Sequence, residues 1–309
     1  MSQDSKQDQS TITSWHRNLL VTAAIFIVLL VAMGGVLCVT QSIRSCPDWP
    51  GCFGKILPPL EISPILEITH RFMAGISGLF LLAAAITGLM RTRQLLWIMV
   101  PPVLTIPLVI AVSYFGAMVV LHGISPGWAA VDLGSALLVV LLIVAAAVFA
   151  DAHRRDPDLP DRIKFSSPYT RLVLTTLIVV YGVLVTGVLV AGQNSFTSCL
   201  GWPIYSTTLY QIDTLDAGNI LRQSFSLIGI ILIIMVVVQA RRNHRHHPGI
   251  IRTASLMGGL FLLEMLLQVL VQVFDFNVFL LVAYTVTMAI FWGVLVALAV
   301  NVGLDVEHR

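Results

Sequence analysis

The chain has 309 residues, of which 57% are hydrophobic and only 11% are charged. Its mean hydropathy of +0.89 excludes a soluble globular protein and indicates a polytopic membrane protein, with the lipid bilayer as its first partner. The net charge of +2 at pH 7 gives no reason to expect a nucleic acid as a partner.

Eight apolar stretches are long enough to cross a bilayer, whose hydrocarbon core of about 30 Å needs about 20 apolar residues per helix. Backbone polar groups must be satisfied inside the membrane, and the short alternating segments of a β-barrel are missing, so each stretch is predicted to be an α-helix. The stretches cover residues 18–39, 67–90, 95–121, 127–150, 170–191, 218–240, 253–274 and 277–301. The predicted fold class is therefore an all-α membrane protein with eight transmembrane helices.

The distribution of Lys and Arg predicts the orientation of the helices. With an even number of spans, both termini share one side with the loops near 91–94, 151–169 and 241–252, which carry most of the basic residues. The opposite loops hold only Arg44 and Lys55, apart from two arginines at helix entrances. The positive-inside rule then predicts cytoplasmic termini and external cysteine loops in a multi-pass plasma-membrane protein. The first span lacks a cleavage site and is expected to be retained.

A sequence repeat divides the chain into two halves. The segment 46–52, Cys-Pro-Asp-Trp-Pro-Gly-Cys, returns in eroded form at 199–205 as Cys-Leu-Gly-Trp-Pro-Ile-Tyr, 153 residues further along (199 minus 46). We predict an N-terminal four-helix half over 1–150, a cytoplasmic linker over 151–169 and a C-terminal four-helix half over 170–309. The two halves are expected to pack as tandem pseudo-symmetric four-helix bundles.

The cysteines have different expected states. Cys46 and Cys52 lie close together in an external, oxidising loop, so we predict a disulfide, redox-active or not; the alternative is a pair of free thiols. The loop offers no convincing zinc ligands, and the chain has no C-x-x-C-H motif for covalent haem attachment. Cys199 has lost its second cysteine, which is Tyr205, and is expected to be a free thiol. Cys38, inside the first span, is expected to be a small buried apolar residue.

Three ionisable residues open the second helix, in Glu67-Ile68-Thr69-His70-Arg71. Glu67 and His70 are three residues apart and share a helix face, and ionisable residues at membrane depth indicate a functional site. We interpret them as a metal–porphyrin site, with the His70 imidazole on iron, Arg71 on a propionate and Glu67 as an acid–base group. The alternative is an interfacial role, with Glu67 as a helix cap.

Two residues are candidates for a second haem ligand in the same half. His122 lies where the third helix ends, and Asp132 lies about one turn into the fourth. A carboxylate inside an apolar span costs roughly 2.5–3.5 kcal/mol on insertion scales, so Asp132 is expected to have a partner, either Arg71 or His70. The alternative for His122 is a solvated interfacial histidine.

The matching positions of the second half carry other residue types. Arg222-Gln223 stands on the sixth helix and Tyr284 on the eighth, and neither glutamine nor tyrosine makes the usual haem pair, so no haem is expected in this half. Glu264 and Gln268, one turn apart on the seventh helix, are expected to hydrogen-bond each other or a neighbouring helix.

Taken together, these residues resemble the heme A synthase family. The likeness covers the duplicated four-helix halves, the Cys-Pro-x-Trp-Pro-x-Cys loop and the Glu-x-x-His-Arg helix entry. The resemblance implies oxidation of the haem O methyl group to the formyl group of haem A for terminal oxidases. It also implies one histidine on each even-numbered helix, with the first pair at the substrate haem and the second pair holding haem b. Of these four, His70 alone is present, because Asp132, Gln223 (or its neighbour Arg222) and Tyr284 take the other positions.

Two function hypotheses follow. The first is a divergent heme A synthase whose N-terminal half binds haem O, haem A or haem b, with haem O synthase and cytochrome oxidase as partners. The alternative is a catalytically inactive homologue that serves as a structural subunit or assembly factor of a respiratory or photosynthetic membrane complex. A transporter is a third, minor hypothesis, since repeated halves also suit alternating access.

Overall fold

The computed structural model describes residues 12–55, 58–123, 125–157, 159–190, 199–202, 217–244 and 247–305. Within these ranges it contains eight helices that are long and apolar enough to cross a membrane. The predicted all-α membrane fold is therefore confirmed.

Each predicted apolar stretch corresponds to one helix, and the predicted and observed ends agree to within five residues. Their bounds are α2 Ser14–Val39, α3 Ile62–Arg91, α4 Leu96–His122, α5 Pro126–Arg155, α6 Pro168–Val190, α7 Ala217–Asn243, α8 Pro248–Val273 and α9 Val278–Asp305. Helix α5 continues to Arg155, so the irregular connection to α6 starts at Asp156 and is shorter than the predicted linker. Proline stands at the first position of α6 and at the start of α5 and α8. It fits there because the backbone N–H that proline lacks would have no partner within the first turn of a helix.

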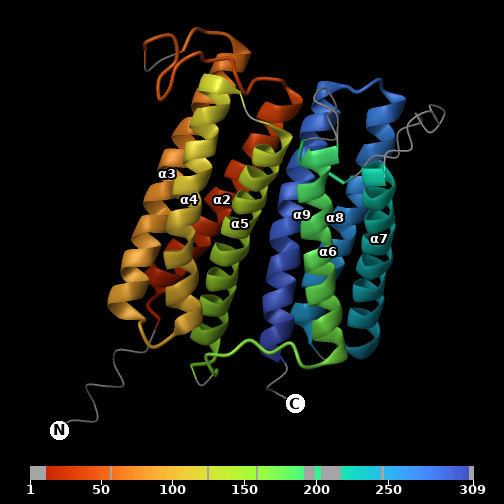
Figure 1. Cartoon of the computed structure of the whole chain (residues 1–309). Coiled ribbons are helices and arrows are strands. Elements are labelled where there is room, and N and C mark those ends of the chain that lie inside the picture. Colours follow the sequence, from red (N-terminus) through yellow and green to blue (C-terminus); the bar gives the residue numbers. More distant parts are fainter. Residues whose placement is uncertain are drawn as a thin grey trace.

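The helices form two groups of four, which stand side by side in Figure 1. In the first group, α2 and α4 each pack against both α3 and α5, so α3 and α5 occupy opposite corners. In the second group, α6 and α8 each pack against both α7 and α9. The groups meet where α2 and α5 contact α9 and where α5 contacts α6. The end of the molecule that carries segments 40–61 and 199–202 is called the loop end below.

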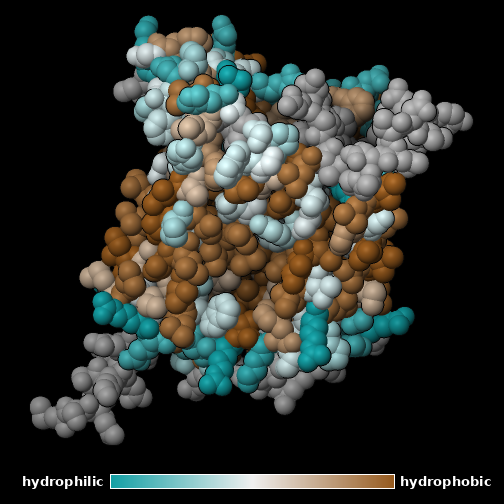
Figure 2. Space-filling model, viewed as in Figure 1, coloured by the Kyte–Doolittle hydropathy of each residue, from teal (hydrophilic) through white to brown (hydrophobic). Residues whose placement is uncertain are grey.

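The surface has the pattern of a membrane protein. Figure 2 shows a hydrophobic band around the middle of the molecule, with hydrophilic residues concentrated towards both ends. Large exposed apolar side chains are spread along the helices, including Leu79, Ile110, Ile178 and Leu262. A continuous apolar surface of this extent fits contact with lipid tails.

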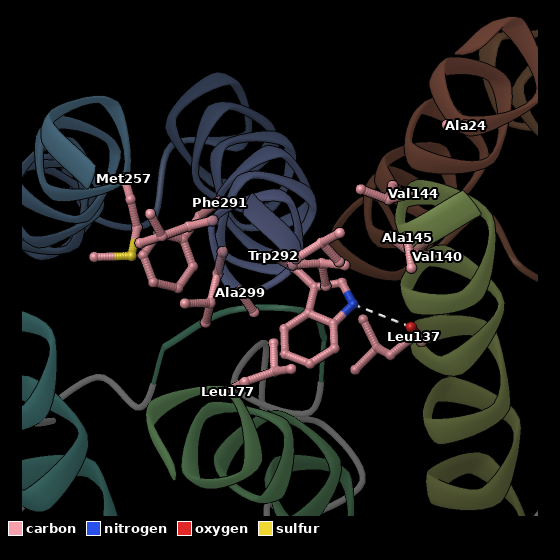
Figure 3. Packing of buried hydrophobic residues seen from close by; sticks show 14 of the residues in the cluster. Ala24, Leu137, Val140, Val144, Ala145, Leu177, Met257, Phe291, Trp292 and Ala299 are labelled. Carbon is pink, nitrogen blue, oxygen red and sulfur yellow. Dashed lines mark hydrogen bonds between the residues drawn. The ribbon is translucent and has the colours of Figure 1, made fainter. Parts of the chain in front are cut away.

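The contact between the two groups is closely packed. Trp292 of α9 is fully buried and its indole N–H donates to the backbone carbonyl of Leu137 on α5, at 3.0 Å (Figure 3). On the neighbouring seam, a Cβ on Gly35 of α2 would lie 2.9 Å from Thr285 Cβ on α9. Glycine at this position therefore allows α2 to touch the second group directly.

Candidate haem site and the two cysteine loops

The first cysteine loop is closed by a disulfide between Cys46 and Cys52, as predicted. Both cysteines are completely buried. Cys52 and Lys55 exchange two backbone hydrogen bonds, Cys52 N–H to Lys55 O at 2.8 Å and Lys55 N–H to Cys52 O at 3.1 Å. The loop is therefore a compact unit attached to the loop end of α3.

Asp48 organises the turn inside this loop. Its carboxylate accepts hydrogen bonds from the backbone N–H groups of Phe53 and Gly54, both at 2.6 Å. These residues have φ values of 55° and 71°, in the left-handed region that favours glycine. The hydrogen bond from Gly54, followed by that from Phe53, holds the pKa of Asp48 below its usual value. The charged carboxylate thus stabilises a turn that Phe53 would not readily adopt alone.

Glu67 and Arg71 fasten the loop to α3. Glu67 is 2% exposed and accepts a hydrogen bond from the backbone N–H of Cys46 at 2.8 Å. Its other oxygen pairs with Arg71 Nη2 at 2.5 Å. Arg71 Nη1 donates to the carbonyl oxygens of Asp48 at 2.8 Å and Gly51 at 2.5 Å. Sequence reasoning missed this role, although the i,i+4 spacing of Glu67 and Arg71 on one helix was a usable signal.

His70 lies one helical turn beyond Glu67, deeper in the apolar part of α3. Its Nδ1 atom is buried, and the ring forms no hydrogen bond with any residue that the structure describes. On the facing side, a Cβ added to Gly34 of α2 would lie 3.6 Å from His70 Cε1, so the ring rests against α2. An imidazole without a hydrogen-bond partner at membrane depth is suited to bind iron.

The donor set fits a haem rather than a bare metal ion. Within the described ranges, no three His, Cys, Asp or Glu residues lie close enough to hold a metal between them. A haem brings its own four equatorial nitrogens and needs only one or two axial ligands from the protein. His70 alone therefore meets the minimum requirement.

The prediction that Asp132 pairs with Arg71 or His70 is wrong. Asp132 Oδ1 is buried and has no hydrogen-bond partner among the described residues, and the carboxylate that pairs with Arg71 is that of Glu67. The physical reason is the order of the helices, because α3 and α5 stand at opposite corners of their group. His122 is exposed at the end of α4, which is where the sequence placed it.

Both predictions for the remaining cysteines are also wrong. Cys38 and Cys199 form a disulfide across 161 residues of sequence, so neither is a free thiol. The cause is the position of α2, which borders both groups of helices. Segment 199–202 of the second half therefore lies close enough to the end of α2 for Cys199 to bond Cys38. Tyr205, the position of the lost cysteine, lies outside the described residues.

Trp202, the counterpart of Trp49, has the opposite environment. Trp49 is half exposed on the first loop, whereas Trp202 is 1% exposed inside the second group. A Cβ on Gly229 of α7 would lie 2.7 Å from the Trp202 ring, and the ring packs edge-on against Phe261 of α8 at 5.2 Å between centroids. The indole therefore fills the interior of the second group between α7 and α8.

The polar residues of the second group gather around Trp202. Tyr284 Oη donates to the Trp202 carbonyl oxygen, and Glu264 Oε1 accepts from the Trp202 N–H at 3.5 Å. Glu264 thus bonds the backbone of segment 199–202, whereas the sequence predicted Gln268 or a neighbouring helix as its partner. Of the two residues predicted for the degenerate site on α7, Arg222 is buried, whereas Gln223 is exposed and is not part of this cluster.

Fold and site together define a multi-pass helical membrane protein in which His70 lies one helical turn from Glu67, a residue that fastens a disulfide-closed loop. The family model described as "Cytochrome oxidase assembly protein" (COX15-CtaA) matches residues 17–308. This chain belongs to that family.

Several curated relatives are named heme A synthase. The protein from Bacillus licheniformis is 30% identical over 184 residues, which cover 58% of this chain and 60% of that protein. The one from an Exiguobacterium species is 27% identical over 196 residues, 63% of each chain. The one from Geobacillus thermodenitrificans is 24% identical over 296 residues, 91% of this chain and 88% of that protein. The chain therefore matches less than two thirds of the length of the first two relatives.

Proposed function

We propose that this protein is a heme A synthase-like oxidoreductase that converts the methyl group of haem O to the formyl group of haem A, for use by a terminal oxidase. The observation that carries the proposal is His70, an imidazole without a hydrogen-bond partner among the described residues, below a loop fastened by Glu67 and Arg71. The relatives named heme A synthase support the same reaction.

In this proposal the chain's own residues bind and orient the substrate. His70 holds the iron, Arg71 binds a propionate, and Glu67 acts as the acid–base group beside the oxidised carbon. The haem, when bound, supplies the redox-active iron. The Glu67–Arg71 pair also holds the disulfide loop against the part of α3 that carries His70.

The proposal places haem in the N-terminal half only. In the C-terminal half, Trp202 fills space between α7 and α8, and Arg222 and Tyr284 stand inside in place of imidazoles. The domain division remains as proposed from the sequence, with 1–150 and 170–309 as the two halves. We also propose that the membrane is the plasma membrane, with the cysteine loops on its external side.

A second candidate function is a catalytically inactive homologue that acts as an assembly factor or structural subunit of a larger membrane complex. The packing around Trp202 favours it, because among the described residues the positions that a second haem and its ligands would need hold Trp202, Arg222 and Tyr284. The family description as an assembly protein suits this candidate as well as the first.

One experiment separates the two candidates. The chain is co-expressed with a haem O synthase in a host that lacks haem A, and the extracted pigments are analysed by chromatography. Haem A, or its hydroxylated precursor, is expected for the wild type and for His247→Ala, a histidine change at the opposite end of the molecule. His70→Ala is expected to abolish the product, and His122→Ala to leave most of it. Accumulation of haem O alone, together with stable co-purification of a larger complex, would replace the enzyme by the assembly factor.

A further inference from the structure

Segment 199–202, called the strap below, connects the two groups of helices at the loop end. All four residues are buried. At one end, Cys199 is bonded to Cys38 near the end of α2. At the other end, Trp202 enters the group formed by α6, α7, α8 and α9. The strap therefore joins α2 to the interior of the second group.

Two buried side chains hold the backbone of the strap. Glu264 of α8, which is completely buried, accepts from the N–H of Trp202 at 3.5 Å. Tyr284 of α9, which is 3% exposed, donates to the carbonyl oxygen of the same residue. A Cβ on Gly201 would collide with the Tyr284 ring, so the strap also packs directly on that ring. Both backbone polar groups of Trp202 are thus bonded by side chains from different helices.

The strap and α9 contact the same turn of α2 that contacts His70. A Cβ on Gly35 would lie 2.9 Å from Thr285 Cβ and 3.6 Å from Leu200 Cβ, so this side of α2 meets both α9 and the strap. The adjacent residue, Gly34, faces the His70 ring, with 3.6 Å from its added Cβ to His70 Cε1. One turn of α2 is therefore enclosed by the strap and α9 on one side and by His70 on the other.

We propose that Glu264 and Tyr284 are positioning residues for His70, which act through the strap, the Cys38–Cys199 disulfide and the Gly34–Gly35 turn of α2. Glu264 and Tyr284 hydrogen-bond the strap, and the strap is joined to α2 by the disulfide and by the contact of Leu200 with Gly35. Helix α2 in turn packs against the imidazole of His70 through Gly34. The contacts are continuous, and they are buried from Glu264 and Tyr284 to Gly35, which is the arrangement through which packed side chains transmit a displacement. The inference rests on the proposed function only in taking His70 as the haem ligand.

The first test needs no haem. The rate at which diethyl pyrocarbonate modifies His70 is measured by peptide mass spectrometry on the purified protein in lipid nanodiscs, with exposed His122 as the internal reference. Glu264→Gln and Tyr284→Phe are each expected to change the His70 rate by about 2- to 30-fold while the His122 rate stays constant. Thr287→Val is the matched control, since its hydroxyl lies on the same helix as Tyr284 but bonds Ala283 of its own helix.

The second test uses haem b as the probe and reads its absorption spectrum. Glu264→Gln and Tyr284→Phe are expected to shift the Soret band of the bound haem, whereas Thr287→Val is expected to leave it unchanged. His70→Ala is expected to abolish binding. If His70→Ala binds haem normally, the proposed function fails, while the modification rates still decide whether the strap positions His70.

A double-mutant cycle distinguishes coupling through the strap from general loosening. Cys199→Ser and Tyr284→Phe are expected to have non-additive effects on the His70 rate, because both act through the strap. Tyr284→Phe removes one oxygen and keeps the ring packed, so it tests the proposal if Glu264→Gln fails to fold. If Tyr284→Phe also fails to fold, Cys199→Ser tests it, because this change leaves the side chains of Glu264 and Tyr284 in place. Unchanged His70 rates and an unchanged Soret band in folded variants would overturn the proposal.

Discussion

Glu67 has a structural role that is separable from any catalytic one. Its carboxylate is buried and bonds the buried Cys46 N–H and the largely shielded Arg71 guanidinium. Because a charge that loses its buried partner is left unpaired, a substitution here affects the loop before it affects chemistry. Loss of activity in a Glu67 variant therefore has to be compared with its stability.

Glu67→Ala is expected to destabilise the protein by about 3–5 kcal/mol, since the Cys46 N–H and the largely shielded Arg71 guanidinium would both lose the carboxylate that they share. Thermal unfolding in one detergent, followed by circular dichroism, measures the change. Glu61→Ala is the control, because Glu61 is exposed and outside this network. Equal melting temperatures for the two variants would contradict the loop-fastening role.

Asp48 makes the first loop sensitive to pH. Its pKa is lowered by the N–H groups of Gly54 and Phe53, so the stabilisation is present above the unfolded pKa of about 3.9 and is lost as pH falls through the lower folded value. Compared with Asp48→Asn, the wild type is expected to protect the Phe53 and Gly54 amides from hydrogen exchange at pH 7. The difference should shrink as the pH falls below about 4. A difference independent of pH would show that the carboxylate charge is not involved.

At the scale of elements, α2 has contacts that no other helix of the first group combines. It packs against α3 and α5 on its own side and against α9 on the other. Its glycine pair allows both close approaches, and Cys38 near its end bonds the strap. The two cysteine loops have diverged accordingly, since the first is closed on itself and the second is bonded to α2.

Cys38→Ser is expected to destabilise the protein by about 2–5 kcal/mol, because the disulfide closes a long loop in the unfolded chain. Non-reducing peptide mapping should find a Cys38–Cys199 peptide pair in the wild type, and alkylated Cys199 in the variant. The Cys46–Cys52 pair should stay intact in both proteins. Alkylation of Cys199 in the wild type without reductant would rule out the cross-link.

At the scale of the whole molecule, α2 begins and α9 ends at the end opposite to the cysteine loops (Figure 1). The excess of Lys and Arg in the loops of that same end predicts that it faces the cytoplasm. The helical fold and the basic residues together therefore predict an orientation that reporter fusions can check.

A green fluorescent protein fused after Arg309 is expected to fluoresce, since this reporter folds in the cytoplasm. Alkaline phosphatase fused after Lys55 is expected to be active, because that position lies on the predicted external side. The two reporters exchanged between these positions serve as controls. Active phosphatase at Arg309 would reverse the predicted orientation.

The sequence by itself determined the eight helices, the disulfide of the first loop and the grouping of Glu67, His70 and Arg71. These features are local, since span length, a short cysteine spacing and helical periodicity each depend on neighbouring residues. Only the tertiary structure decided that Cys38 bonds Cys199, that Arg222 rather than Gln223 faces inwards and that Asp132 has no partner among the described residues. The physical reason is that these outcomes depend on which helices become neighbours and on how each is rotated about its axis, and in a uniformly apolar helix the hydrophobic pattern does not specify that rotation.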